Sequence, residues 1–186
     1  MGFTRKELES FRDHTVPDLI GDDTRLLFVG INPGLWTAAT KTHFCHPSNR
    51  FYPALRRAGL IDFDIDTDNG MTDQQRASFV AAGMGISNLV QRATVRASEL
   101  TADELRTGGK RLVGLIGLLR PTVVAIAGVT AYRTAFDARS AVLGRQEKTG
   151  DAEWWVLPNP SGLNAHVQID DLAGWFRIVA DRAGLQ

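Results

Sequence analysis

The chain has 186 residues, the usual size of one compact domain and long enough to bury a hydrophobic core. Its composition, 44% hydrophobic and 23% charged, is ordinary for a globular protein and excludes extensive disorder. Lysine plus arginine equals aspartate plus glutamate, so the formal net charge is +0, which argues against non-specific coating of nucleic acid. We expect a monomer with a single domain over residues 1–186, in which residues 1–20 form a helix or arm.

The sequence carries no sign of a membrane segment or a disulfide framework. No apolar run approaches the length of a membrane span, and the N-terminus lacks the apolar core of a signal peptide. The single cysteine, Cys45, excludes an intramolecular disulfide and a four-cysteine metal or iron–sulfur site. We expect a bacterial-type cytoplasmic protein that acts at the nucleoid and needs no metal or cofactor.

Short apolar runs alternate with helical patterns along the chain. In chain order we expect a short helix or arm through residue 15, a strand at 26–31, a helix at 48–59 capped by Ser48, a polar loop at 62–70, a helix at 74–82, a strand at 85–90, a helix at 101–119 interrupted by Gly108-Gly109, a strand at 123–127, a helix to about 136, an irregular or hairpin segment at 140–152, a strand at 154–157 and a helix at 169–183. This alternation predicts a three-layer α/β/α domain whose central sheet is mostly parallel and has about four strands.

Two loops of related sequence follow predicted strands. Gly30-Ile31-Asn32-Pro33-Gly34 follows the first strand, and Asn159-Pro160-Ser161-Gly162-Leu163-Asn164 follows the last. Ligands of such sheets bind outside the carboxyl ends of the strands, so we expect the loops to meet at one site. Each loop alone has a simpler interpretation, because Asn-Pro-Gly ends many strands and Leu163 would pack beneath the last helix.

A third segment, residues 42–51, interleaves aromatic, polar and basic side chains before a helix. Phe44 is a candidate to stack on a base, since every base presents a π-face. The alternative makes Phe44 and Phe51 core residues and gives His46 the role of satisfying the helix start.

The three segments together carry a family resemblance. Gly-Ile-Asn-Pro-Gly-Leu, Phe-x-His-Pro-x-Asn-Arg-Phe and Leu-Pro-Asn-Pro-Ser-Gly-Leu occur in this order between about Leu26 and Leu163. The set resembles the mismatch-specific uracil/thymine DNA glycosylases of the uracil-DNA glycosylase superfamily. The resemblance implies a uracil-DNA glycosylase-like fold and a monofunctional DNA-repair enzyme. Such an enzyme flips uracil, or thymine or a damaged pyrimidine, mispaired with guanine out of double-stranded DNA and hydrolyses its N-glycosidic bond.

The resemblance also implies roles for single residues. Asn32 would orient the attacking water. Gly30, Ile31, Pro33, Gly34, Phe44 and Asn159 would form the base pocket, and Ser161, Gly162, Leu163 and Asn164 would fill the opened duplex and contact the orphaned guanine. Because an amide does not titrate, Asn32 can only orient water and present a dipole, which predicts a slow enzyme of broad base tolerance.

Several positions depart from the family pattern. Trp36 follows the first Gly-Leu, Asn88 stands where some relatives carry a basic residue, and Ala165 replaces an arginine common in bacterial members, with His166 as a substitute. These departures leave the preferred base open. A uracil- or damage-DNA binding protein with little turnover is the alternative, followed by a nucleoside hydrolase or nucleotide-binding domain. Candidate phosphate contacts are Arg50, Arg56, Arg57, Arg92 and Arg96.

The acidic run Asp64–Gly70 is not a calcium loop. Counting from Asp64, the positions that need glycine and glutamate hold Asn69 and Gln75, so a solvated loop is expected. Cys45 and His46 are adjacent in sequence, which by itself does not make a catalytic pair.

Overall fold

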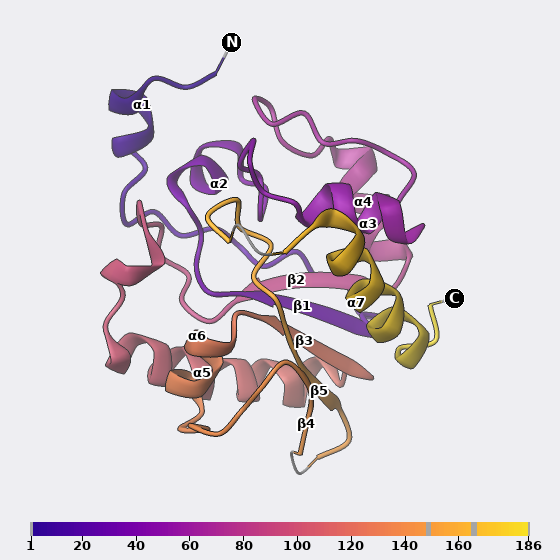
Figure 1. Ribbon diagram of the computed structural model, residues 1–186. Coiled ribbons are helices and arrows are strands. Elements are labelled where there is room, and N and C mark those ends of the chain that lie inside the picture. Colours follow the sequence, from indigo (N-terminus) through magenta and orange to yellow (C-terminus); the bar gives the residue numbers. More distant parts are fainter. Residues whose placement is uncertain (1, 148–149, 165–166, 186) are drawn as a thin grey trace.

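The computed structural model describes residues 2–147, 150–164 and 167–185 (Figure 1). A five-stranded sheet runs through its centre in the order β2-β1-β3-β5-β4. The strands are β1 (Leu26–Gly30), β2 (Met84–Asn88), β3 (Val123–Ala127), β4 (Gly144–Gln146) and β5 (Glu153–Leu157). The first four in this order pair in parallel, and β4 pairs antiparallel to β5. The predicted three-layer α/β/α fold is confirmed, with one strand more than expected because β4 forms within the segment expected to be irregular or hairpin.

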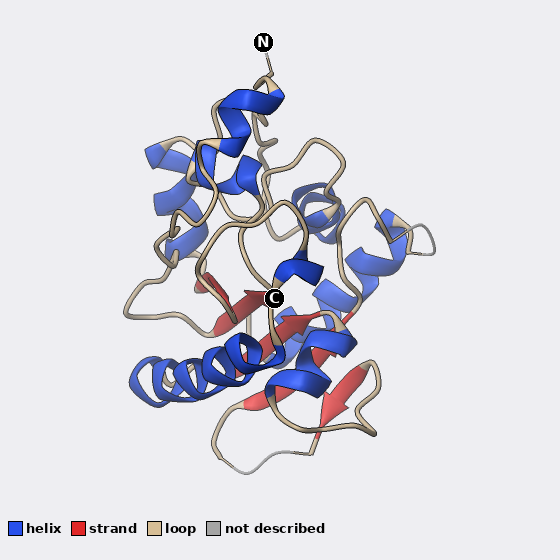
Figure 2. Cartoon of the chain, turned by 90° about the vertical axis from the view of Figure 1, so that its left-hand side faces the viewer, coloured by secondary structure: helices blue, strands red, loops and turns tan. Residues whose placement is uncertain are grey.

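The helices lie on both faces of the sheet (Figures 1 and 2). They are α1 (Arg5–Glu9), α2 (Leu35–Thr40), α3 (Phe51–Ala58), α4 (Asp73–Ala81), α5 (Ala102–Leu119), α6 (Val129–Ala135) and α7 (Ile169–Arg182), with a 3₁₀ turn at Ala97–Glu99. Helix α2 was not predicted from the sequence. None of the helices in the described ranges is both long and apolar enough to cross a membrane.

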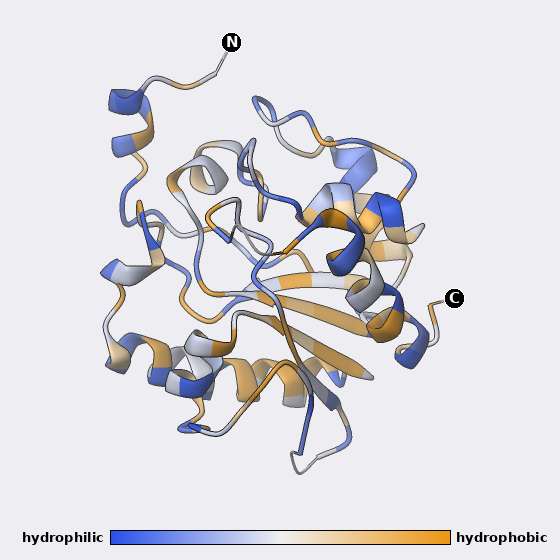
Figure 3. Ribbon diagram, viewed as in Figure 1, coloured by the Kyte–Doolittle hydropathy of each residue, from blue (hydrophilic) through white to orange (hydrophobic). Residues whose placement is uncertain are grey.

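The alternation of side chains along β1 explains why both faces are covered. Successive residues of a strand point to opposite faces. Leu26 and Phe28 pack with α3, α4 and α7, whereas Leu27 and Val29 pack with α5 and α6. All four side chains are buried, and β1 and β3 are hydrophobic along their length (Figure 3). A strand buried on both faces belongs in the middle of a parallel sheet.

The strand order also fixes where a ligand can bind. The chain passes from β1 to β2 on one side and then crosses to β3 on the other, so strand order reverses around β1. The crevice at the carboxyl ends of the strands at such a reversal is the usual ligand site of an open α/β sheet. The loops that follow β1 and β5 both begin at this edge.

The helix α5 is continuous through Gly108 and Gly109, contrary to the predicted interruption. These glycines do not break the helix. They allow it to approach the backbone of neighbouring segments closely. A Cβ atom at Gly108 would lie 2.2 Å from the carbonyl oxygen of Leu89, and one at Gly109 would lie 2.6 Å from that of Ala135. Two later glycines of the same helix, Gly114 and Gly117, face open space.

We therefore predict opposite effects of the same substitution along α5. Gly114→Ala should raise the free energy of unfolding by about 0.5–1 kcal/mol, because alanine loses less backbone entropy in a helix. Gly108→Ala should lower it by about 1–3 kcal/mol, because the added methyl group meets backbone that must shift. Urea unfolding followed by circular dichroism measures both. Stabilisation by Gly108→Ala would contradict the close approach.

Candidate active site

A cavity of about 760 Å³ opens at the carboxyl ends of the strands and joins the two loops singled out from the sequence. Of the predicted site residues, those that line it are Ile31, Asn32, Pro33, Gly34, Phe44, Asn159, Ser161, Leu163 and Asn164. Gly30 and Gly162 do not line it, but both permit close packing beside it. A Cβ at Gly162 would lie 2.7 Å from the backbone oxygen of Ser48, so glycine is needed where the second loop rests on the third segment.

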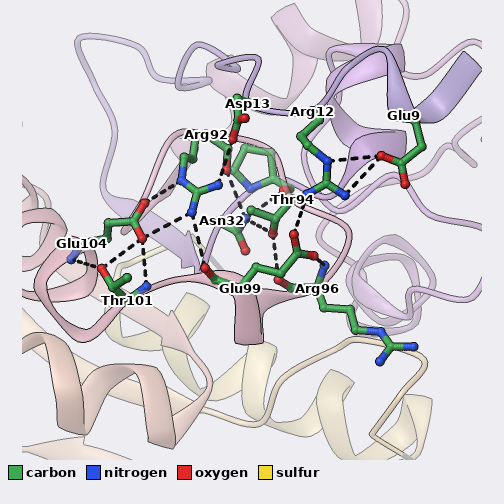
Figure 4. Close-up of polar contacts among 11 residues, drawn as sticks. Glu9, Arg12, Asp13, Asn32, Arg92, Thr94, Arg96, Glu99, Thr101 and Glu104 are labelled. Atoms are coloured by element: carbon green, nitrogen blue, oxygen red, sulfur yellow. Dashed lines mark hydrogen bonds and ion pairs between the residues drawn. The ribbon is translucent and has the colours of Figure 1, made fainter.

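The side-chain amide of Asn32 is held in one orientation. Its Nδ2 donates to the carbonyl oxygens of Pro33 and Arg92, both at 3.1 Å, and to Oγ1 of Thr94 at 2.7 Å (Figure 4). Carbonyl oxygens only accept, so the NH₂ end must face them. The Oδ1 end is left without a donor among the described residues and is the end available to a ligand or water in the cavity. Thr94 was not singled out from the sequence.

Asn159 is fixed in the opposite sense. Its Oδ1 accepts the backbone N–H of Ser161 at 3.0 Å, so its Nδ2 is the free end. Gly128 lies between this amide and the first loop, since a Cβ there would lie 3.3 Å from Cδ1 of Ile31 and 3.9 Å from Nδ2 of Asn159. With φ at +105°, Gly128 adopts a backbone conformation that other residues avoid. Asn159 therefore presents a hydrogen-bond donor to the same cavity that Asn32 lines.

A third amide, Asn88, stands at the end of β2 and is buried. His43 is also buried, and its Nε2 lies 2.9 Å from the carbonyl oxygen of Pro17. Nε2 must therefore carry the proton, and Nδ1 accepts from Nδ2 of Asn88 at 2.9 Å. Oδ1 of Asn88 then faces Gly30 and the ring of Phe44, because a Cβ at Gly30 would lie 2.4 Å from it. Asn88 was noted in the sequence only as a departure, and His43 was not a predicted site residue.

Phe44 supplies the aromatic wall of the cavity. Its ring stacks on Phe51 with centroids 4.2 Å apart and planes 23° from parallel. Phe51 is a core residue, as the simpler interpretation held, whereas Phe44 is half-buried and lines the cavity. Phe44 also has φ at +57°, a strained backbone conformation for an aromatic residue.

The turn before α3 differs from the expected cap. Ser48 does not cap the helix, because Oδ1 of Asn49 accepts the N–H of Phe51 at 2.9 Å. The N–H of Ser48 instead donates to Nδ1 of His46 at 3.2 Å, which leaves the proton of the neutral ring on Nε2. Burial lowers the pKa of His46, so the ring is neutral near pH 7.

Trp36 is fixed at the mouth of the cavity. Its Nε1 donates to the carbonyl oxygen of Thr67 at 2.5 Å, and its ring meets Phe3 and His46 edge-on. Leu8 of α1 also lines the cavity. The N-terminal segment therefore forms part of the wall, which the sequence did not suggest. Ala165 and His166, the other noted departures, lie outside the described residues.

An ionic network holds the loop on which Asn32 rests (Figure 4). Arg92, whose carbonyl accepts from Asn32, pairs with Asp13 at 2.9 Å and with Glu104 at 2.5 Å. The hydrogen bond from Arg92 lowers the pKa of Glu104 to about 2, so this carboxylate stays charged throughout the neutral range. The N-terminal segment and α5 are thereby tied to the same loop.

Two other groups noted in the sequence have structural roles. Burial raises the pKa of the Cys45 thiol, which therefore stays protonated near pH 7. In the acidic loop, Asp66 accepts from the N–H of Asp68 at 2.8 Å and from Nδ2 of Asn69 at 2.6 Å. These bonds form a local turn.

Amides and an aromatic ring line a cavity at the carboxyl ends of the parallel strands of an α/β protein, a lining that suits a planar, polar ligand. The chain belongs to the uracil DNA glycosylase superfamily, whose family model matches residues 17–177. The fold is similar to the solution structure of a candidate uracil DNA glycosylase from Methanosarcina acetivorans, with a TM-score of 0.58 and 16% sequence identity. This similarity covers 90% of the present chain and 98% of the other. Membership of this superfamily implies DNA glycosylase activity.

The buried His43 leads to a prediction about stability. Burial lowers its pKa below the ordinary 6.5, so in the pH range between the folded-state pKa and 6.5 the unfolded chain binds a proton that the folded chain does not. The contribution of neutral His43 to the free energy of unfolding is therefore fully present above pH 6.5 and is lost as the pH falls below it. His43→Gln should therefore lose less unfolding free energy than the wild type between about pH 7.5 and about pH 5.5, measured with urea. Equal losses would show that folding does not lower the pKa of His43.

Proposed function

We propose that this protein removes uracil mispaired with guanine from double-stranded DNA by hydrolysis of the N-glycosidic bond, with thymine or a damaged pyrimidine as a further substrate. The observation that carries the proposal is the fixed orientation of three amides around one cavity. Oδ1 of Asn32, Nδ2 of Asn159 and Oδ1 of Asn88 are the free ends. All three residues line the cavity.

The side-chain amides of Asn159 and Asn88 complement one edge of uracil. Uracil offers an acceptor at O2 and a donor at N3, which match the donor of Asn159 and the acceptor of Asn88. Cytosine has an unprotonated N3, so it would face the oxygen of Asn88 with a lone pair. A site whose polar group is left unpaired by the wrong base discriminates strongly. Thymine shares these donors and acceptors, so the preference between uracil and thymine depends on the fit of the methyl group.

The reaction follows from the position of Asn32. The target nucleotide leaves the base stack, and a water held by Oδ1 of Asn32 attacks C1′ of its sugar. The bond between C1′ and N1 of the base breaks, and its electron pair leaves with the base, where the donor of Asn159 stabilises the charge on O2. The attacking water loses a proton as the C1′–O bond forms, and the departing base gains one from solvent. The products are the free base and an abasic sugar.

The site also explains why slow turnover is expected. Neither Asn32 nor Asn159 can titrate, and no aspartate or glutamate is among the described residues that line the cavity. Positioning of water and neutral hydrogen bonds stabilise the transition state less than a charged group would. This same feature supports the second candidate, a protein that binds uracil-containing DNA with little turnover.

Leu163 is the proposed wedge in the opened duplex. Its side chain is 88% exposed although it is large and apolar. Two hydrogen bonds hold the loop beneath it: Asn164 donates to the carbonyl of Asn159 at 3.1 Å, and Arg50 donates to the carbonyl of Asn164 at 2.8 Å. An apolar side chain at the tip of such a loop suits insertion into a base stack, where burial would stabilise it.

The deciding experiment is base release by the purified chain from end-labelled duplexes that hold G·U, A·U, G·T or G·C pairs, with a single-stranded uracil substrate beside them. Alkali cleaves the strand wherever an abasic site has formed. Release from G·U with none from G·C supports the proposal. Tight binding to G·U without release would favour the binding protein.

We predict that Asn32→Ala lowers the single-turnover rate of uracil release from the G·U duplex by about 100-fold or more, because the attacking water loses the side chain that positions it. Asn32→Asp should also be slower, since a carboxylate would face the carbonyl oxygens of Pro33 and Arg92 in place of the donor they require. Binding to a duplex with a tetrahydrofuran abasic analogue opposite guanine serves as the folding control. A full rate in Asn32→Ala would refute the role of Asn32.

Asn88→Ala should reduce uracil release by about tenfold or more, because the N3–H of the base loses its acceptor. The tetrahydrofuran duplex has no base to recognise, so its affinity should be unchanged. Loss of both properties would indicate a structural defect, and loss of neither would show that Asn88 does not read the base.

A further inference from the structure

Arg96 differs from the other candidate phosphate contacts because its side chain has no partner among the described residues. Four of the five arginines singled out from the sequence are engaged within the protein. Arg50 donates to the carbonyls of Asn164 and Val167, Arg56 pairs with Asp64, Arg57 pairs with Asp170, and Arg92 pairs with Asp13 and Glu104. Arg96 is exposed, lines the cavity and forms neither an ion pair nor a side-chain hydrogen bond with the described residues. Figure 4 shows its guanidinium pointing away from the ionic network.

The nearest acidic residue along the chain is prevented from neutralising Arg96. Glu99 accepts the backbone N–H of Arg96 at 2.7 Å through Oε1. Its Oε2 pairs with Arg12 at 2.6 Å. The hydrogen bond from Arg12 also lowers the pKa of Glu99, so the carboxylate remains committed to this pair near neutral pH. The positive charge of Arg96 is therefore available to a ligand.

The backbone of Arg96 is joined to the amide of Asn32 by two hydrogen bonds. Nδ2 of Asn32 donates to Oγ1 of Thr94 at 2.7 Å, and this hydroxyl donates to the carbonyl of Arg96 at 2.9 Å. Arg96 thus stands at a fixed place beside the group that faces the sugar. The phosphates of a nucleotide are separated from its C1′ only by the sugar ring.

We propose that Arg96 binds a phosphate of the DNA strand that carries the flipped nucleotide. The inference rests on the proposed function and adds to it a contact with the backbone. A guanidinium recognises phosphate through two parallel N–H donors, which gives a contact both charge and direction. Because Arg96, Thr94 and Asn32 are linked, the contact seats the sugar of that nucleotide against the amide that holds the water.

The low overall charge makes this contact measurable. With a formal net charge of +0, the protein has little general attraction for DNA. Each phosphate contact releases counterions, so the logarithm of the binding constant falls with the logarithm of salt concentration by about 0.9 per contact. Removing one contact should lower that slope by about one.

The test uses the full chain and a duplex with a tetrahydrofuran abasic analogue opposite guanine, with binding measured across a range of salt concentrations. Arg96→Gln should weaken binding about tenfold at low salt and reduce the slope by about one. Arg96→Lys keeps the charge and should retain the slope. Arg56→Gln is the matched control, since it removes the same charge from a residue already paired with Asp64 and should leave the slope unchanged.

Three outcomes decide the matter. A reduced slope confined to Arg96→Gln supports the contact. An unchanged slope in Arg96→Gln overturns it, as does an equal reduction in Arg56→Gln, which would indicate only a loss of general charge. Failure of the wild type to release any base would remove the proposed function, yet the salt dependence of its binding to the abasic duplex would still decide the role of Arg96.

Discussion

The parallel pairing of β1 between β2 and β3 is the constraint on which the site depends. It buries β1 on both faces and places the carboxyl ends of the three strands, at Gly30, Asn88 and Ala127, along one edge of the sheet. Chain that leaves this edge must form loops, and these loops enclose the cavity. Gly128 then lets the segment after β5 approach the segment after β1, since it occupies the narrow space between them without a side chain.

Within that frame, the properties of the cavity come from the asymmetry of the amide group. An asparagine side chain donates from one end and accepts at the other, so fixing one end determines what the other offers. Backbone carbonyls fix Asn32, a backbone N–H fixes Asn159, and a buried neutral histidine fixes Asn88. The arrangement is precise without being charged, which fits the proposed recognition of a neutral base and the slow turnover expected of it.

The N-terminal segment is part of this arrangement, although the family match begins only at residue 17. Leu8 lines the cavity, and Arg12 and Asp13 pair with Glu99 and Arg92 around the loop that holds Asn32. Residues outside the shared family region thus help to hold Asn32, the residue proposed to position the attacking water.

The amino-acid sequence was enough to predict the layers of the fold, because hydrophobic periodicity reports which faces of a strand or helix are buried. It also placed both loops at the carboxyl ends of strands, since parallel strands share that edge. It failed where the role of a residue depends on what surrounds it in the folded chain. Gly108 and Gly109 were expected to interrupt a helix, but they pack against the backbone of Leu89 and Ala135, which lie far from them in the sequence. Ser48 was expected to cap a helix, but its N–H donates to the ring of His46 instead. Likewise, the folded structure was needed to show which end of each asparagine is free and which of the five arginines has no partner among the described residues. Those properties depend on neighbours that are 62 to 117 residues away along the chain, such as Thr94 for Asn32 and Val167 for Arg50.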